Sequence, residues 1–332
     1  MWVGDNASSM EYTTLGSTGV KVSKICLGCM SFGSPEWRPW VLEEDESMPI
    51  LERALDLGVN FFDTANMYSH GESERILGEA LDGHWDDVFV GTKVYFEIDG
   101  RTQSAGLSRK TVEQELDASL ERLGTDTVDL FQMHRWDYDT PIEETLRAFD
   151  DAVRRGKTRY VGASSMWAHQ FSHALRKSDE LDLESFATMQ NHYNAVYREE
   201  EREVLPICER EGIGVVPWSP LARGYLARPH EEIDATERGE TEDQMYSHPY
   251  RDGGGKEINE RVEEVAEDED LSMAQVALAW VMSKDAVDAP IIGVTSIEHL
   301  EQAVEATEVS LSDSDIGYIE EPYEPVEVSG HW

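Results

Sequence analysis

The stretch NFFDTA, residues 60–65, decides the fold, because it is a short apolar run that ends in polar residues. The segment after it, Ser73–Gly83, has apolar residues at helical spacing with polar residues between them. A strand followed by an amphipathic helix is the building unit of an α/β fold. Because the strand is apolar at nearly every position, it is predicted to lie in a parallel sheet that helices cover.

The same unit repeats along the chain. Eight apolar runs are predicted to be strands: Lys24–Met30, Asn60–Ala65, Val88–Lys93, Val128–His134, Thr158–Ser164, Phe186–Asn191, Gly214–Pro220 and Ala289–Val294. The segments predicted to be helices between them include Met48–Gly58, Ser73–Gly83, Arg109–Leu123, Ile142–Arg155, His169–Ser178 and Glu201–Glu211. Several helices are expected to end at a glycine, the residue type favoured just beyond a helix; these glycines are Gly58, Gly83, Gly124, Gly156 and Gly212.

Eight strand–helix units at this spacing predict a (β/α)8 TIM barrel. A β-hairpin, Thr13–Ser23, is expected before the first strand. Two extra helices, Lys256–Glu269 and Ser272–Lys284, are expected before the eighth strand. A doubly wound sheet is the alternative, but it would need a glycine-rich turn after its first strand.

We expect residues 1–332 to form this one domain, because the chain has no linker and no low-complexity tract. The seventh strand is followed by a long irregular loop at about 221–255, and loops of this length are usually functional or disordered. The C-terminal tail, at about 320–332, is also expected to be irregular.

Charge is the most unusual feature of the composition, since 68 acidic residues against 28 basic ones give a formal net charge of −40. Such a surface repels phosphate, so nucleic-acid binding is not expected. The acidic residues are spread along the chain, and only 8 of the basic residues are lysine. This composition resembles that of proteins from salt-loving organisms, where molar salt shortens the Debye length to about 3 Å and screens self-repulsion. A merely acidic mesophilic protein is the alternative.

No apolar run approaches the roughly 20 residues that a membrane-spanning helix needs, and residues 1–12 do not have the pattern of a signal peptide. We therefore expect a cytoplasmic protein with no membrane partner. The cysteines, Cys26, Cys29 and Cys208, are too few for a disulfide framework, which agrees with a reducing compartment. Cys26 and Cys29 form a C-x-x-C pattern, but they lie in an apolar run and are predicted to be buried.

Four titratable side chains fall at or just after the ends of predicted strands: Asp63, Tyr68, Lys93 and His134. In a barrel these ends face one shared mouth, where active sites lie. Hydride transfer to a carbonyl carbon leaves charge on the oxygen, which then needs a proton and nearby donors. Tyr68 is expected to supply the proton, with its pKa lowered by the ammonium of Lys93. Asp63 would hold that ammonium in place, and His134 would donate to the substrate oxygen.

The segment DTANMYSHGESE, residues 63–74, resembles the signature of the aldo-keto reductases around their catalytic Asp and Tyr. Lys93 and His134 lie where that superfamily has its Lys and His. The resemblance extends from Thr14 to about Leu311 and is closest to the bacterial-type reductases related to potassium-channel β subunits. Some channel-associated members lack the histidine, so its presence implies turnover. The resemblance implies NADP(H)-dependent reduction of a small-molecule aldehyde or ketone to the alcohol.

The resemblance also implies where the cofactor binds. GASS, residues 162–165, resembles the strand end whose serine, here Ser164, bonds the nicotinamide carboxamide, with Gln190 favoured over Asn191 as its companion. WSPLARGYL, residues 218–226, resembles the segment in which an aromatic residue stacks on nicotinamide and the next residues wrap the pyrophosphate. The residues assigned to this segment and its loop are Trp218, Ser219, Leu221, Gly224, Arg228 and Arg238. The two arginines are candidates for the adenosine phosphates, with a solvated position as the alternative for Arg238.

A last cofactor segment, IGVTSIEHLEQ, residues 292–302, keeps the family frame. The expected contacts are Gly293, Thr295, His299 and Gln302. Many members place Arg, Lys or Gln against the 2′-phosphate, whereas this chain has Thr295, Ser296 and His299 there. NADPH is therefore expected from the family pattern, and NADH is the alternative.

Loops at the mouth are expected to form the substrate pocket, with Met30, Phe32, Tyr95 and Trp136 as its walls and with Trp37, Trp40 and the C-terminal tail as additions. An aromatic lining implies an apolar or aldehyde-bearing substrate face. Arg38 and Arg135 would favour an anionic substrate, although surface ion pairing explains them equally well.

Other enzyme classes lack their motifs in this chain. The Tyr-x-x-x-Lys pair and early G-x-G-x-x-G of a short-chain dehydrogenase, a P-loop frame and a G-x-S-x-G elbow are all missing. No group of His, Asp or Glu has the spacing of metal ligands, so no metal site is expected. A redox sensor or regulatory subunit that binds NADP(H) with little turnover is the alternative from another functional class. The sequence does not indicate the oligomeric state.

Overall fold

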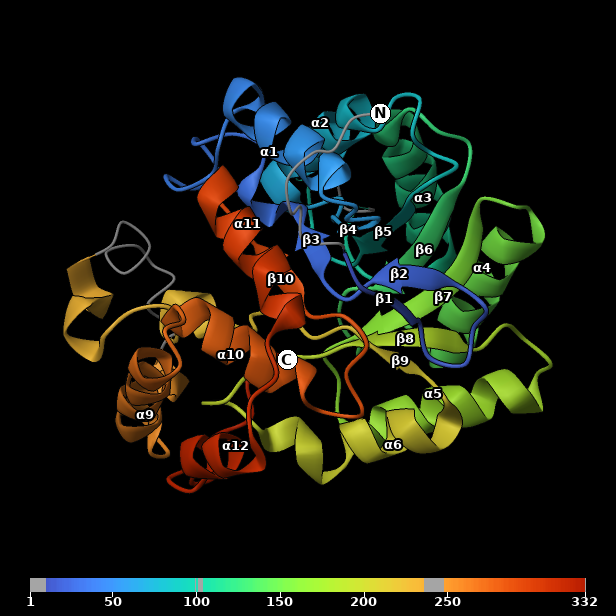
Figure 1. Cartoon of the computed structure of the whole chain (residues 1–332). Helices are drawn as coiled ribbons and strands as arrows, with labels where there is room; N and C mark the ends of the chain where they lie inside the picture. The colour runs from blue at the N-terminus through green and yellow to red at the C-terminus, as the bar shows by residue number, and fades with distance from the viewer. Residues whose placement is uncertain (1–9, 99, 101–103, 236–247, 332) are drawn as a thin grey trace.

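The computed structural model describes residues 10–98, 100, 104–235 and 248–331. Eight parallel strands form one sheet in the order β10-β3-β4-β5-β6-β7-β8-β9. Their bounds are β3 (Cys26–Gly28), β4 (Phe61–Asp63), β5 (Phe89–Val94), β6 (Val128–Met133), β7 (Thr158–Ser164), β8 (Phe186–Gln190), β9 (Gly214–Val215) and β10 (Ile291–Gly293). The sheet closes where Trp218, after β9, bridges Ile291 of β10. The predicted (β/α)8 barrel is confirmed (Figure 1).

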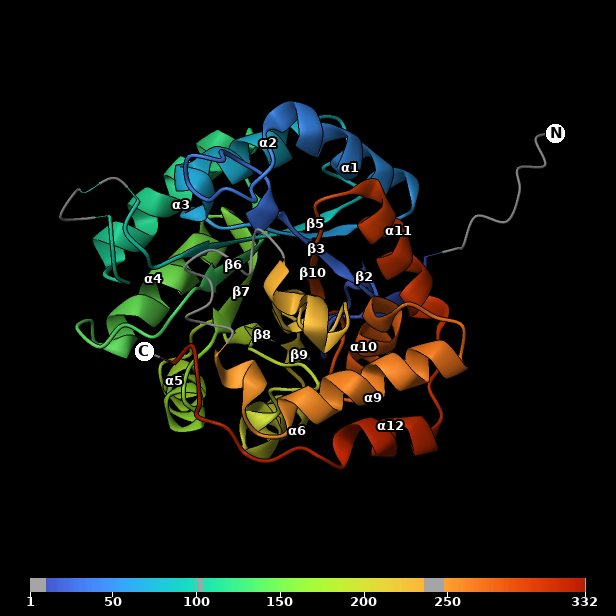
Figure 2. The same ribbon diagram turned by 90° about the vertical axis from the view of Figure 1, so that its left-hand side faces the viewer.

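Helices surround the barrel, as the two ribbon views show (Figures 1 and 2). Their bounds are α1 (Glu44–Asp56), α2 (Glu72–Ala80), α3 (Arg109–Leu123), α4 (Ile142–Arg154), α5 (Ala168–Glu180), α6 (Val204–Glu211), α9 (Gly255–Asp268), α10 (Met273–Met282), α11 (Ile297–Glu305) and α12 (Asp313–Glu320). Short 3-10 turns are η1 (Cys29–Ser31), η2 (Tyr68–Gly71), η3 (Glu199–Arg202), η4 (Ala222–Gly224), η5 (His230–Ala235), η6 (His248–Arg251) and η7 (Ala306–Glu308). Within the residues that the structure describes, no helix has both the length and the apolar character needed to cross a membrane.

Local sequence explains how the helices begin and end. At the start of α3 the hydroxyl of Ser108 accepts a hydrogen bond from the backbone N–H of Thr111, and the helix ends at Gly124. The five glycines predicted beyond helix ends all have φ between 69° and 83°. L side chains adopt this region only at a cost, so the prediction from glycine spacing is confirmed.

Some helix boundaries differ from the prediction. Helix α1 begins at Glu44 instead of Met48, because three acidic residues occupy its first turn and Glu43 and Glu46 cap each other. The predicted helix at 201–211 is divided into η3 and α6. Helices α11 and α12 were not predicted; they have only 9 and 8 residues, and a serine caps each one, Ser296 and Ser312.

The predicted N-terminal hairpin is present and covers one end of the barrel. Strand β1 (Tyr12–Thr14) pairs antiparallel with β2 (Lys21–Ser23). Leu15, between them, is buried with side chains of the barrel interior. The backbone N–H of Gly16 donates to the carboxylate of Asp288 over 2.9 Å. The hairpin therefore packs against the N-terminal end of the barrel, and the carboxyl ends of the strands lie at the other end.

The three cysteines are all buried and form no disulfide. Cys26 lies in the cluster inside the barrel, whereas Cys29 and Cys208 lie in the cluster between sheet and helices. Burial raises the pKa of all three thiols. The prediction that Cys26 and Cys29 are buried packing residues is confirmed.

Candidate active site

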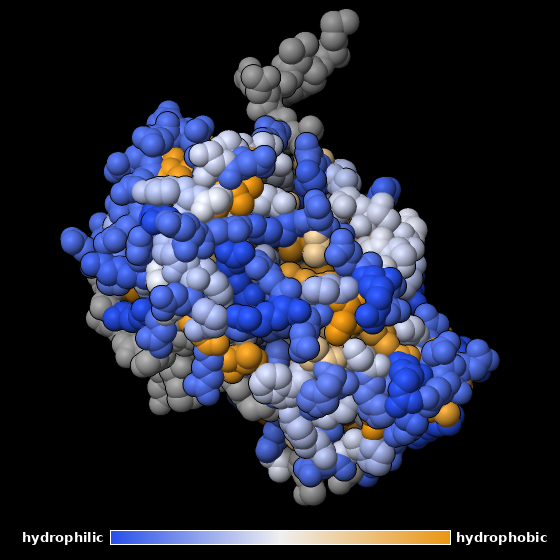
Figure 3. Space-filling view, turned by 90° about the horizontal axis from the view of Figure 1, so that it is seen from below, coloured by the Kyte–Doolittle hydropathy of each residue, from blue (hydrophilic) through white to orange (hydrophobic). Residues whose placement is uncertain are grey.

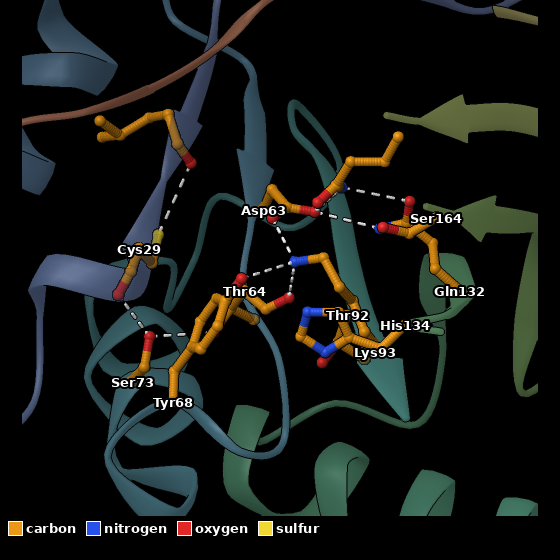
Figure 4. A network of polar contacts seen from close by, with 12 residues as sticks. Cys29, Asp63, Thr64, Tyr68, Ser73, Thr92, Lys93, Gln132, His134 and Ser164 are labelled. Carbon is orange, nitrogen blue, oxygen red and sulfur yellow. Dashed lines mark hydrogen bonds and ion pairs between the residues drawn. The ribbon is translucent and has the colours of Figure 1, made fainter. Parts of the chain in front are cut away.

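The four predicted catalytic side chains meet at the carboxyl ends of three neighbouring strands (Figure 4). Asp63 is the last residue of β4, Lys93 lies near the end of β5, and His134 directly follows β6. Tyr68 begins η2, in the loop after β4. The structure thus brings together all four residues that were selected for their positions at strand ends.

The ammonium group of Lys93 is the centre of this site. Its side chain has no exposed surface, and its Nζ atom forms an ion pair with the carboxylate of Asp63. Nζ also donates to the carbonyl oxygen of Thr64 over 2.8 Å and lies 3.3 Å from the phenolic oxygen of Tyr68. These three partners match the three hydrogens of an ammonium group. Asp63 balances a charge that would be costly to bury alone.

Two amide side chains hold the other oxygen of the Asp63 carboxylate. Oδ1 of Asp63 accepts from Nε2 of Gln132 over 3.0 Å and from Nε2 of Gln190 over 2.9 Å. Gln132 was not predicted as a site residue. It precedes His134 by two positions, and strand alternation puts positions two apart on the same face, so this signal was available. The side-chain nitrogen of Gln190, which the resemblance assigns to the nicotinamide, donates within the site to Asp63 and, over 3.3 Å, to Oε1 of Gln132.

Burial decides the protonation of Tyr68. Burial raises the pKa of Tyr68 above its ordinary value, and the nearby charge of Lys93 offsets this only in part. Lys93 lowers this pKa, as expected, but the net pKa is not lowered, because the desolvation of the phenol outweighs the effect of the ammonium. Burial alone would lower the pKa of Lys93, but Asp63 and Tyr68 together raise it. The site thus holds a protonated phenol beside a charged ammonium.

His134 is a neutral imidazole beside the phenol. Burial, Lys93 and Arg135 hold the pKa of His134 well below its ordinary value. The ring stands edge-on to Tyr68 at a centroid distance of 5.9 Å and edge-on to Phe96 at 4.9 Å. Its Nδ1 atom is buried without a hydrogen-bond partner in the part of the chain that the structure describes. Such an atom indicates a place for a ligand or water.

Trp218 lies at the mouth, as predicted, and its orientation is fixed by its neighbours. One face of the indole stacks on His192 at a centroid distance of 4.1 Å, and Nε1 donates to Oγ of Ser165 over 2.9 Å. Ser165 and Ser219 have φ of 40° and 55°. Such conformations cost energy in residues other than glycine and cluster at functional sites. Ser164, at the end of β7, is fully buried next to them.

Asn191 provides a second sign of a binding site. It directly follows β8 and is fully buried, yet its amide nitrogen and oxygen have no hydrogen-bond partner among the described residues. A buried amide normally has partners for both atoms. A carboxamide would match it, because each amide offers one donor group and one acceptor. The residues at this side of the mouth therefore fit a nicotinamide.

The segment after Trp218 forms a tight turn that a helix holds in place. The carbonyl oxygen of Leu221 accepts from the backbone N–H of Gly224 over 2.9 Å, and Gly224 has φ of 95°. Asn259, fully buried in α9, donates to the carbonyl oxygens of Tyr225 over 2.5 Å and Arg228 over 3.0 Å. Asn259 was not predicted. Its role depends on a contact between segments about thirty residues apart, for which the sequence has no local signal.

The remaining predicted cofactor residues lie around the start of α11. Gly293, Thr295 and His299 are exposed, and Gln302 is half-buried. A Cβ atom at Gly293 would meet nothing within 4 Å, so the backbone there borders open space. Arg238 lies outside the described residues.

Three of the four residues predicted to line the substrate pocket are partly exposed, and the fourth is buried. Met30, Tyr95 and Trp136 are half-buried. Phe32 has no exposed surface and packs in the core cluster between the sheet and the helices, so its ring is not exposed at the open mouth as a wall of the pocket would be. Two aromatic rings lie close to the catalytic residues instead: Phe96, which was not predicted, and Trp37, with its centroid 6.3 Å from that of Tyr68.

The C-terminal tail reaches this mouth, as expected. A Cβ atom at Gly330 would lie 3.3 Å from Cζ2 of Trp218. The ring of His331 stands edge-on to Trp167 at 5.0 Å, and its Nε2 atom lies 3.0 Å from the carboxylate of Glu200. The tail is therefore packed beside the indole.

Comparison with known proteins agrees with this geometry. Residues 24–324 match the Aldo/keto reductase family. The chain is 43% identical to versiconal hemiacetal acetate reductase of Aspergillus parasiticus, over 95% of this chain and 98% of that protein. It is 40% identical to an aldo-keto reductase of Alternaria alternata, over 98% of this chain and 95% of the relative. An aldo-keto reductase of Metarhizium robertsii is 39% identical, with 98% and 94% covered. On this evidence the chain belongs to the aldo/keto reductase family.

Proposed function

We propose that the protein reduces an aldehyde or ketone to an alcohol with NADP(H), and that Tyr68 is the general acid. The observation that carries the proposal is the buried series of contacts from Asp63 through Lys93 to Tyr68, beside neutral His134. Membership of the aldo/keto reductase family supports carbonyl reduction and a nicotinamide cofactor.

The chemistry follows from the protonation of the four residues. Bound NADP(H) would supply a hydride to the carbonyl carbon. Tyr68 donates its proton to the carbonyl oxygen as negative charge develops there, and the imidazole of His134 donates a hydrogen bond to the same oxygen. Lys93 stabilises the phenolate that Tyr68 becomes, and Asp63 keeps the ammonium oriented. The phenolate is then reprotonated from solvent.

The cofactor is assigned to residues on one side of the mouth. Ser164 and Asn191, with Gln190, would bond the carboxamide, and the indole of Trp218 would stack on the nicotinamide ring. The residues assigned to the pyrophosphate and the adenosine half are Ser219, Leu221, Gly224, Arg228, Arg238, Gly293, Thr295, His299 and Gln302. Segment 292–302 contains no Lys or Arg, and Glu298 lies in the first turn of α11. These acidic surroundings keep NADH as the alternative to NADPH.

The substrate is proposed to be a carbonyl compound with an apolar or aromatic body, since Phe96 and Trp37 lie beside His134 and Tyr68. Versiconal hemiacetal acetate reductase, one of the relatives, is named for a hemiacetal substrate. Aldehydes that form hemiacetals are therefore a reasonable class with which to begin a substrate panel.

We also propose that the protein works in a cytoplasm of high salt concentration and that residues 1–332 form one domain. Within the family, we propose that it belongs near the reductases related to potassium-channel β subunits. The charge of −40 supports the first of these. Figure 3 shows a face that is mostly hydrophilic, with apolar residues visible between the hydrophilic ones. The curated relatives named above are fungal, so the source and the branch rest on the sequence features alone.

The test is NADPH oxidation with a panel of aldehydes by wild type, Tyr68→Phe and Tyr12→Phe. Tyr12→Phe removes the same hydroxyl from the hairpin at the other end of the barrel, where it donates to the Gly58 carbonyl over 2.8 Å. Tyr68→Phe is expected to lower kcat by about 10²- to 10⁴-fold, and Tyr12→Phe to leave it unchanged. Wild type no faster than Tyr68→Phe on every aldehyde would indicate an NADP(H)-binding sensor with little turnover.

A further inference from the structure

His192 has no role in the reaction described above, yet it lies against the residue assigned to the nicotinamide. The imidazole is stacked between Tyr197, at 4.0 Å and 13°, and Trp218, at 4.1 Å and 10°. Only 1% of His192 is exposed. Because the imidazole covers one face of the indole, a nicotinamide ring could stack only on the opposite face.

Both ring nitrogens of His192 have partners from distant parts of the chain. Nε2 lies 2.7 Å from the hydroxyl of Tyr250, in η6, and Nδ1 lies 3.2 Å from the hydroxyl of Ser329, in the C-terminal tail. A hydroxyl can donate or accept, so a neutral imidazole is satisfied at both nitrogens. Burial, followed by Arg223 and Arg135, holds the pKa of His192 well below its ordinary value, which agrees with a neutral ring.

The backbone joins the same residues. His192 and Trp218 form a parallel bridge, and the backbone N–H of Trp218 donates to the carbonyl oxygen of Asn191 over 2.9 Å. The amide of Asn194 donates to the carbonyl oxygen of Ser219 over 2.9 Å. The indole is therefore fixed by a ring on one face, by its neighbours in the chain and by its own N–H bond to Ser165.

We propose that His192 is a positioning residue for the nicotinamide. It fixes the plane of the Trp218 indole. It also connects that ring to η6 through Tyr250 and to the C-terminal tail through Ser329. An indole that is already oriented loses less conformational freedom when a second ring stacks on it. The inference rests on the proposed function, because it requires that Trp218 stack on the nicotinamide.

The test compares two ligands: NADP⁺ and 2′-phospho-ADP-ribose, which lacks only the nicotinamide. His192→Phe keeps a flat ring between Tyr197 and Trp218 but removes both nitrogen contacts. It is expected to weaken NADP⁺ binding about tenfold and to leave 2′-phospho-ADP-ribose binding unchanged in calorimetric titrations. His84→Phe, the same change at an exposed turn, is the control and is expected to bind both ligands as wild type does.

Equal weakening for both ligands, or no weakening for either, overturns the inference, because neither result assigns His192 to the nicotinamide. If His192→Phe does not fold, Ser329→Ala and Tyr250→Phe take its place, since each removes the hydroxyl partner of one His192 nitrogen. Each is expected to weaken NADP⁺ alone about threefold, and unchanged affinity in both overturns the inference.

Trp218→Leu separates the failure of this inference from the failure of the proposed function. If Trp218→Leu does not weaken NADP⁺ binding, the stacking assignment is wrong, and the inference falls with it. If Trp218→Leu weakens NADP⁺ and His192→Phe does not, the stacking assignment stands and only the role of His192 is wrong.

Discussion

The Nζ atom of Lys93 lies 3.3 Å from the phenolic oxygen of Tyr68, and yet burial keeps the pKa of Tyr68 above its ordinary value. The ammonium therefore does not ionise the phenol in the resting protein. Its effect is greatest when Tyr68 has lost its proton, because a phenolate is attracted to the ammonium far more strongly than a phenol is. We infer that Lys93 acts on the charge that forms during the reaction.

Replacement of Lys93 tests this role and the balance of charge in the barrel. Lys93→Met is expected to lower kcat by about 10²- to 10⁴-fold and to destabilise the protein by about 3–5 kcal/mol, because Asp63 is left buried without its cation. The double variant Asp63→Asn/Lys93→Met should recover stability but not activity. Steady-state kinetics and urea unfolding measure the two effects. A double variant less stable than Lys93→Met would contradict the account of the charge balance.

The loss of stability in acid should depend on the two buried neutral histidines, His134 and His192. The pKa of His134 and that of His192 are both lowered in the folded protein. In the unfolded chain a histidine has a pKa of about 6.5, so below that pH the unfolded chain binds more protons than the folded protein does. The contribution of the two neutral histidines to the free energy of unfolding is therefore complete above that pH and is lost as the pH falls. Urea titrations at about pH 7 and pH 5 should show a smaller acid loss of unfolding free energy in His134→Gln than in wild type. Equal losses in the two proteins would refute this.

Glu74 provides a prediction on stability away from the mouth. Its fully buried carboxylate accepts from Nε of Arg122 over 2.6 Å and from the hydroxyl of Thr92. Arg122→Met is expected to cost about 3–5 kcal/mol of unfolding free energy, because an uncompensated charge stays buried. The double variant Glu74→Gln/Arg122→Met should recover part of the lost unfolding free energy.

The matched control for Arg122→Met is Arg210→Met. Arg210 pairs with Glu211, but its side chain is 67% exposed. Exposed pairs contribute at most about 1 kcal/mol, so the control should lose little stability. Similar losses in the two variants would show that burial of Glu74 is not the cause.

Salt should stabilise the protein if the excess of acidic residues is an adaptation to high salt. Because 68 acidic residues outnumber 28 basic ones, the negative charges of the folded protein repel one another, and molar salt screens that repulsion. Tm is expected to rise steadily from dilute buffer to about 2 M KCl. Sucrose, which does not screen charge, should raise Tm much less at the same osmotic strength. A maximum of Tm in dilute buffer would count against a high-salt setting.

The strand ends could be predicted from sequence because they depend on local pattern. Asp63, Lys93 and His134 each end or follow an apolar run, and a barrel brings such ends together whatever the loops do. Gln132 shares this regularity and could have been found by counting two positions back from His134. The barrel class and the glycines beyond the helices follow from the same kind of local signal.

The other site features depend on packing between distant segments. His192 meets Ser329 across 137 positions of the chain, and nothing near either residue indicates the partner. Phe32 and Phe96 are both aromatic residues near strand ends, but only the fold shows which one faces His134. The pKa of Tyr68 depends on how deeply the phenol is buried, and spacing alone does not reveal that depth.

The enclosed pairing of Lys93 with Asp63 also bears on how such a protein can change over generations. The charges of Lys93 and Asp63 cancel inside the barrel, so the site around Tyr68 is little affected by the net charge of the outer surface. Salt weakens the effect further, because it shortens the distance over which surface charges act. Substitutions on the outer helices can therefore accumulate acidic residues without retuning the chemistry. A lineage could move between dilute and saline habitats by altering its exterior while the catalytic interior is inherited intact.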